Sequence, residues 1–192
     1  MDLNEIYDSK IEFYITEFCE KQRIADMREM PQAVWNSCLM YVCRYVFPDK
    51  SKLKSNEILG NTPMNCNAYD YNKLIPIADY YIYLCGMYDK EISAMGFSKL
   101  TGIDVDTIYQ WGNNGNRLSS SALIIYKKLM AGREESLSNK LADGRKNPVG
   151  VLAILNRHYQ WNLPGVSKEP AKKTLGIEEL PQLNSPKNII DG

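Results

Sequence analysis

The sequence predicts an all-α protein, a helical bundle that contains a helix-turn-helix and ends in an extended C-terminal tail. No window shows the sustained alternation of apolar and polar residues that a half-buried strand needs. Apolar residues instead recur at three- and four-residue spacing, as on an amphipathic helix. The 192 residues are 44% apolar, which suffices for one globular domain with appendages and excludes a fully disordered chain.

Residues 1–47 are predicted to form a helical pair. The first helix carries an apolar stripe, and the second begins at Met30-Pro31 and ends at Phe47-Pro48, because proline is tolerated in a first helical turn. Both apolar faces are interpreted as core, and the pair as an oligomerisation or partner module. The stripe of the first helix consists of Ile11, Tyr14, Ile15 and Phe18.

Residues 48–73 lack periodicity and are rich in turn-forming residues, so we expect a loop or linker there. The next helix should start near Pro76. It displays a tyrosine-rich face, which is typical either of a half-buried helix or of a surface that stacks on bases or on a partner. This face comprises Ile77, Tyr80, Tyr81, Leu84 and Tyr88.

The stretch from Tyr88 to Trp111 has the spacing of a helix-turn-helix. We expect a first helix over Lys90–Leu100 and a recognition helix over Val105–Trp111. Ser98 is the small residue where the helices touch, Gly102 forms the turn, and Asp104 caps the second helix. The expected apolar anchors are Phe97, Leu100, Ile103, Ile108 and Trp111. A generic helical hairpin could produce the same spacing.

The exposed face of the second helix is expected to carry Thr107, Tyr109 and Gln110. Thr and Gln can reach base edges, Gln suits a bidentate contact to adenine, and Tyr can contact phosphate. Asp104 and Asp106 oppose a close approach of phosphate. The helix contains no Lys or Arg, so most of the attraction for phosphate has to come from elsewhere.

The net charge of zero conceals a cationic segment that could supply this attraction. Residues 1–116 carry 11 basic and 16 acidic side chains, a net charge of −5. Residues 117–173 carry 11 basic and 4 acidic side chains, a net charge of +7, and the last 19 residues carry a net charge of −2. A cationic segment of this kind can neutralise several phosphates and make binding steeply dependent on salt.

The glycine- and asparagine-rich stretch at 112–116 is interpreted as a helix stop, and a long helix is expected to begin at 119–121. The basic residues of this region are Lys127, Lys128, Arg133, Lys140, Arg145, Lys146 and Arg157. The predicted phosphate contacts are Lys99, Arg117, Lys127 and Lys128. A solvated charged face is the alternative for any one of them.

The segment Arg133–Trp161 resembles the part that follows the helix-turn-helix in small-terminase-like DNA-packaging proteins of phages and prophages of Gram-positive bacteria. Its long helix ends at a glycine, Asn147-Pro148 begins the next helix, and an aromatic patch closes it. The resemblance covers roughly residues 76–165. It implies sequence-selective binding of phage DNA, oligomer formation and delivery of DNA to a large motor subunit. The chain departs from this family in that residues 1–75 precede the predicted DNA-binding unit.

Several classes of function are not expected. The first twenty residues hold six acidic side chains and no apolar run, so no secretory signal is predicted, and no segment has the roughly 20 apolar residues that cross a membrane. The five cysteines indicate reduced thiols in a cytoplasm. With His158 as the only histidine, we expect no zinc site, no nucleophilic triad, no cofactor and no enzymatic activity.

The sequence therefore predicts a domain over 74–162 that holds the helix-turn-helix and the basic helices, followed by a proline-containing tail over 163–192. The tail could carry a short docking motif at 175–183 or be disordered without function. The leading hypothesis is a cytoplasmic, oligomeric protein that binds double-stranded phage or mobile-element DNA. The alternative is a phage-encoded interaction module that inhibits a host system and uses the helix-turn-helix as a scaffold.

Overall fold

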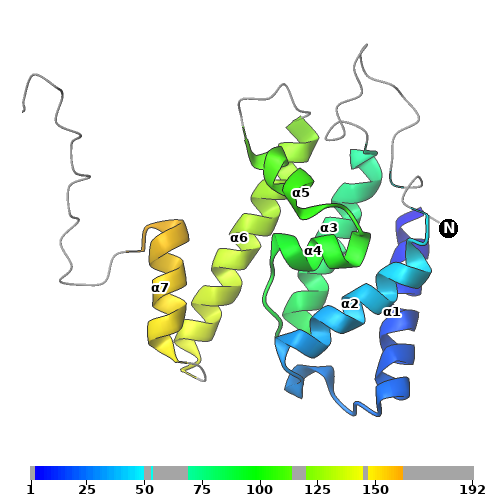
Figure 1. The fold of residues 1–192 in the computed structure, drawn as a ribbon, viewed down its shortest axis with the longest axis horizontal. Coiled ribbons are helices and arrows are strands. Elements are labelled where there is room, and N and C mark those ends of the chain that lie inside the picture. The colour runs from blue at the N-terminus through cyan, green and yellow to red at the C-terminus, as the bar shows by residue number, and fades with distance from the viewer. Residues whose placement is uncertain (1–2, 50–52, 54–68, 114–119, 145–146, 162–192) are drawn as a thin grey trace, which may run out of the picture.

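A computed structural model describes residues 3–49, 53, 69–113, 120–144 and 147–161 (Figure 1). Every regular element among these residues is a helix, which confirms the predicted all-α class. The elements are α1 (Leu3–Gln22), the short 3-10 helix η1 (Met27–Glu29), α2 (Gln32–Val46), α3 (Tyr71–Met87), α4 (Ala94–Thr101), α5 (Val105–Gly112), α6 (Ser120–Ala142) and α7 (Pro148–Tyr159).

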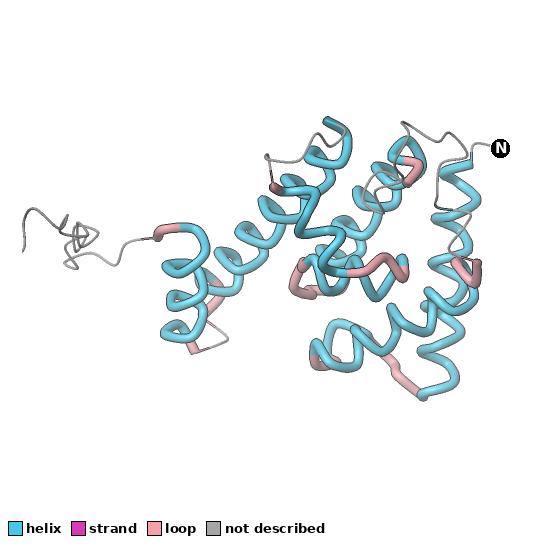
Figure 2. The backbone as a smooth tube through the Cα atoms, turned by 45° about the horizontal axis from the view of Figure 1, so that its top comes forward, coloured by secondary structure: helices cyan, strands magenta, loops and turns pink. Residues whose placement is uncertain are grey.

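The helices surround one main core. Buried side chains from Ile11 in α1 to Leu129 in α6 form a single apolar cluster. The helix α3 packs along α6, α4 packs on α2, and α1 lies against both α2 and α3, so that α3 and α4 occupy the middle of the molecule (Figures 1 and 2). The N-terminal pair and the helix-turn-helix segment thus share this core. Their assignment to separate functional modules stays a prediction.

The two N-terminal helices form where the apolar spacing places them. In α1, Ile11, Ile15 and Phe18 are buried and Tyr14 is half-buried. The helix α2 begins after Pro31. This proline is the N-cap residue, and its backbone is extended. The core face of α2 consists of Trp35, Cys38, Leu39, Val42 and Val46.

The prediction that the next helix starts near Pro76 was wrong. The helix α3 begins at Tyr71, because the Asp70 carboxylate accepts a hydrogen bond from the Lys73 amide and caps the first turn. Pro76 therefore lies inside the helix, and its ring removes the hydrogen bond to the carbonyl of Asn72, an exposed residue that water can reach. The amide of Asp70 also donates to the Leu53 carbonyl (2.9 Å), which ties part of the expected linker to the core.

The expected start of the first helix of the helix-turn-helix was also wrong. The sequence placed it at Lys90, but α4 begins at Ala94 with Ser93 as the N-cap. Lys90 is 5% exposed, and its ammonium group donates to the carbonyls of Met30 (2.5 Å) and Arg28 (3.1 Å). This side chain joins the segment before α4 to the segment before α2.

The C-terminal part of α6 extends beyond the main core and pairs with α7. Leu137, Val151 and Leu155 form a second, smaller buried cluster there. As predicted, Asn147 caps α7, and Pro148 occupies its first position. The pair stands at one end of the molecule (Figure 1).

Some sequence-based predictions concern residues outside the described ranges, namely Arg117, Arg145, Lys146, most of the 48–73 segment and the tail over 163–192. Among the described helices, none combines the length and the apolar composition that a membrane span requires.

The Lys90 contact gives a test of the fold. We expect Lys90→Ala to lower the free energy of unfolding by about 2 kcal/mol, because the carbonyls of Arg28 and Met30 lose a charged donor that is itself buried. The control is Lys10→Ala at an exposed position of α1, which should change stability by less than about 0.5 kcal/mol. Urea titrations followed by circular dichroism measure both, and equal midpoints for the two variants would contradict the assigned role of Lys90.

Candidate nucleic-acid interface

The turn between α4 and α5 is held by local hydrogen bonds that its sequence encodes. Gly102 adopts a left-handed conformation (φ 72°) that favours glycine, and its amide donates to the Ser98 carbonyl (2.7 Å). The Ser98 hydroxyl donates to the Ile103 carbonyl (2.6 Å). The Asp104 carboxylate accepts from the Asp106 amide (2.8 Å) and caps α5. The predicted roles of Gly102 in the turn and of Asp104 as the cap are therefore confirmed, whereas Ser98, predicted as a small residue at the helix contact, also ties the turn by a hydrogen bond.

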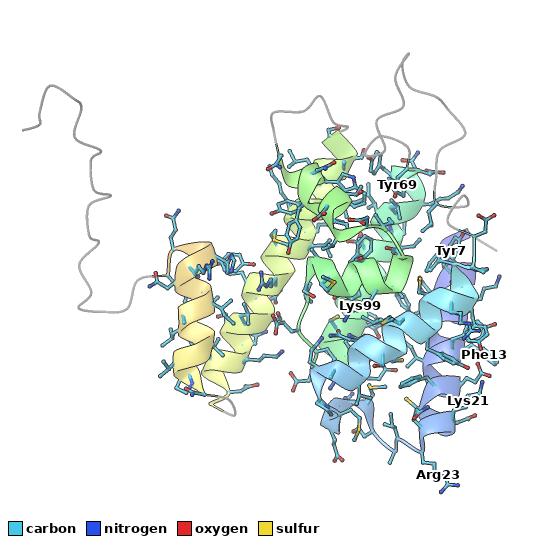
Figure 3. The ribbon with its side chains drawn as sticks, viewed as in Figure 1. Tyr7, Phe13, Lys21, Arg23, Tyr69 and Lys99 are labelled. Carbon is cyan, nitrogen blue, oxygen red and sulfur yellow. The ribbon has the colours of Figure 1, made fainter. Side chains whose placement is uncertain are left out.

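The predicted minicore is present. All five expected anchors are at most 3% exposed. Trp111 lies at its centre, and the rings of Tyr69 and Tyr71 meet it edge-on at centroid distances of 5.9 and 5.8 Å. Tyr71 is the first residue of α3, and Tyr69, labelled in Figure 3, lies just before the N-cap Asp70. The buried side of α5 is therefore held in place by the contact of Trp111 with Tyr69 and Tyr71.

The outer face of α5 is open to solvent. Asp106, Tyr109 and Gln110 are exposed, with Tyr109 46% exposed, whereas Thr107 is half-buried. Residues 106, 109, 110 and 113 recur at three- and four-residue spacing and lie on one side of the helix. The structure thus brings Tyr109 and Gln110 together on this side, with Thr107 beside them.

A glycine fixes the distance between α5 and α6. A Cβ atom added to Gly112 would overlap the ring of Tyr126 in α6. The same Tyr126 ring meets Tyr109 edge-on at 6.5 Å. The sequence identified Gly112 only as part of a helix stop, whereas the structure shows that it also provides the space in which α6 packs.

The described basic residues proposed for phosphate do not form one patch. Lys127 is exposed, and Lys128 follows it about 100° further around α6. The Lys128 ammonium group contacts both carboxylate oxygens of Asp79 in α3, at 2.6 and 2.7 Å. Lys99 is half-buried near the C-terminal end of α4 (Figure 3). Lys128 is therefore held toward α3, whereas Lys127 forms no ion pair with any residue that the structure describes.

The electrostatics of α5 itself are acidic at its start. Asp104 and Asp106 are both exposed and lie at the N-terminal end of the helix, where the helix dipole stabilises negative charge. Burial and the nearby Asp104 carboxylate raise the pKa of Tyr69. A tyrosine hydroxyl is already protonated at neutral pH, and this shift extends its protonated range further toward alkaline pH.

Sequence reasoning missed three residues of this region, Tyr69, Asp79 and Tyr126. Each acts across a gap of more than ten positions in the sequence, on a partner in another helix, and no local spacing pattern marks such a contact. The only available signal was Gly112, since a glycine within a helix can indicate a close neighbour.

Among the described residues, no group of three His, Cys, Asp or Glu side chains is placed to hold a metal ion. Burial raises the pKa of both Cys38 and Cys85 to about 12, which keeps these thiols protonated. His158 is exposed on α7, beside the ring of Tyr159.

Comparison with known proteins identifies no relative. No family model, no curated protein and no solved structure matches this chain.

The Gly112–Tyr126 contact gives a test of the packing between α5 and α6. We expect Gly112→Ala to lower the free energy of unfolding by about 1–3 kcal/mol, because the new methyl group forces the Tyr126 ring to move. The matched control is Gly86→Ala in α3, where a new Cβ meets nothing within 4 Å. This control should be neutral or stabilising, because alanine is the better helix former. Chemical denaturation compares the two, and a neutral Gly112→Ala variant would show that α5 and α6 are not closely packed.

Proposed function

We propose that the chain binds double-stranded DNA through α4 and α5, with α5 as the recognition helix. The biological role we propose is recognition of phage or mobile-element DNA in the cytoplasm of a bacterial host, similar to that of a small terminase in packaging. One observation carries the proposal. Two eight-residue helices joined by a three-residue turn bury all five predicted anchors and leave the polar side of α5 free.

Base reading is assigned to the exposed side of α5. Gln110 can pair with the edge of an adenine, and Tyr109 can contact a phosphate oxygen or a thymine methyl group. Thr107 is half-buried, so its reach is shorter and its contribution should be the smallest of the three.

Phosphate attraction is assigned to Lys99, Lys127 and Lys128, together with Arg117, which lies outside the described residues. The Lys128–Asp79 pair is substantially exposed, with side-chain exposures of 39% and 50%. An exposed pair of this kind is worth about 0–1 kcal/mol. A phosphate can therefore displace Asp79 at little cost, and Lys128 remains available as a phosphate contact.

A protein partner is the second candidate, and a specific observation favours it. Recognition helices contact bases mainly through their N-terminal residues. In α5 this end carries the exposed Asp104 and Asp106, which repel phosphate. A basic surface of a host protein would suit the same end, as expected for an inhibitor that uses the helix-turn-helix as a scaffold. A large motor subunit contacted through the N-terminal helices or the tail belongs to the DNA-packaging proposal instead.

The test separates base reading from phosphate attraction. Thr107→Ala with Gln110→Ala should reduce the preference for a selected sequence by about 1–3 kcal/mol per lost base contact. Lys127→Ala with Lys128→Ala should weaken binding to all sequences alike and reduce the slope of log K against log salt by about 2. Fluorescence anisotropy on duplex DNA, between about 50 and 200 mM salt, measures both effects.

Matched controls are available on helices away from α5. Thr16→Ala with Gln22→Ala replaces the same residue types at exposed positions of α1. Lys10→Ala with Lys21→Ala replaces one exposed lysine and one that is paired with a carboxylate, Glu17 (2.8 Å). Both controls should bind DNA like the parent chain. If the parent chain does not bind duplex DNA at about 50 mM salt, the DNA proposal is overturned and a protein partner is favoured.

A further inference from the structure

The outer face of α2 carries almost no charge. Only Arg44 is charged among the 15 residues of this helix. Ala33, Ser37, Met40 and Arg44 are all exposed, with Met40 58% exposed, and their spacing of four, three and four residues places them in one stripe. Most helices on a protein surface present several charges to water, so this stripe has the composition of a covered surface.

Aromatic side chains flank the stripe on the side of α1. Phe13 is 63% exposed and points outward from α1 at the edge of the molecule (Figure 3). Its ring meets Tyr14 edge-on, Tyr14 stacks on Tyr45 at 5.0 Å, and the Arg44 guanidinium group lies over the Tyr45 ring. Aromatic residues, methionine and arginine are enriched at protein interfaces, which supports a protein partner for this face.

The side chains of the stripe differ in size between its two halves, in a way that is complementary to a second copy of the same stripe. Its N-terminal half is small, with Ala33 and Ser37, and its C-terminal half is large, with Met40 and Arg44. An antiparallel pair of such helices about a two-fold axis places each large residue against a small one. We infer that a second copy of this chain packs antiparallel on α2, with Met40 against Ser37 and Arg44 against Ala33 of the other copy.

Charge favours the same orientation. The segment before α2 carries the exposed acids Asp26 and Glu29, whereas Arg44 lies near the opposite end of the helix. An antiparallel partner brings each Arg44 to the acidic end of the other copy. The segment between α1 and α2 also holds two basic residues, Arg23 and Arg28. Arg23 lies next to the end of α1 (Figure 3), and Arg28 donates its Nε–H to the Met87 carbonyl (2.9 Å) and is directed toward α3. A parallel pair would instead place the two Arg44 side chains together.

The expected dimer is a weak one. A 15-residue helix is about 22 Å long, so α2 alone offers a short contact, and Phe13 and Tyr45 have to add to it to approach the roughly 1,200 Å² that a specific interface buries. A two-fold contact is closed, since each copy uses the same surface, and assembly stops at the dimer. This inference does not depend on DNA binding.

The test exchanges the small and the large side chain at two exposed positions, 37 and 40. Sedimentation equilibrium of the full chain gives the dissociation constant of the parent. Ser37→Met places two methionines against each other, and Met40→Ser leaves a gap, so each should weaken the dimer at least tenfold, about 1.4 kcal/mol. The double variant Ser37→Met/Met40→Ser restores large against small, and its dissociation constant should lie within about threefold of the parent value.

Both positions are exposed in the single chain, and thermal unfolding by circular dichroism verifies that each variant is folded. The control Met87→Ser removes an exposed methionine of α3 (44% exposed) and should leave the dimer unchanged. A parent chain that stays monomeric up to about 100 µM overturns the inference and leaves a different protein as the occupant. Single variants that dimerise like the parent, or a double variant that fails to recover, overturn it equally.

Discussion

The hydroxyl of Tyr81 fixes the place where α4, the first helix of the proposed helix-turn-helix, begins. It accepts a hydrogen bond from the Ser93 amide and donates one to the Ser93 carbonyl, both at 3.2 Å, while the side chain is completely buried in α3. Gly96 lies directly against this hydroxyl, and a Cβ there would overlap it. The start of α4 is thereby held on α3. This contact orients α4, and the turn at Gly102 together with the packing of Trp111 on Tyr69 and Tyr71 then places α5.

The helix α6 connects the α3–α5 region to the C-terminal helix α7. It packs against both α3 and α5, and Leu137 in its C-terminal half packs against α7. Tyr159 of α7 donates its hydroxyl to the Met130 carbonyl (3.1 Å), and the Trp161 indole N–H donates to Glu134 (2.7 Å). The proposed recognition helix α5 and the C-terminal helix α7 therefore both pack on α6. The cations proposed for phosphate, Lys127 and Lys128, lie on this same helix.

Local chemistry predicted the turn correctly because its interactions span only a few residues. Gly102, Asp104 and Ser98 each act on a backbone group at most five positions away. Lys90 is excluded from α4 by a long-range contact, with carbonyls about 60 positions earlier. The start of α3 before Pro76 has a local cause that the sequence prediction overlooked, the cap from Asp70 to the Lys73 amide, and a long-range one, the packing of Tyr71 on Trp111. The Lys128–Asp79 pair joins residues 49 positions apart, which no spacing rule anticipates.

The central claim is that the outer side of α5 is the surface that meets DNA. Amide chemical shifts of the labelled full chain, recorded during titration with a short duplex at low salt, test it most directly. The account predicts that the largest changes fall on Thr107, Tyr109 and Gln110, with smaller changes at Lys99 and Lys127. Changes centred on α1 and α2, or no changes with excess duplex, would contradict it.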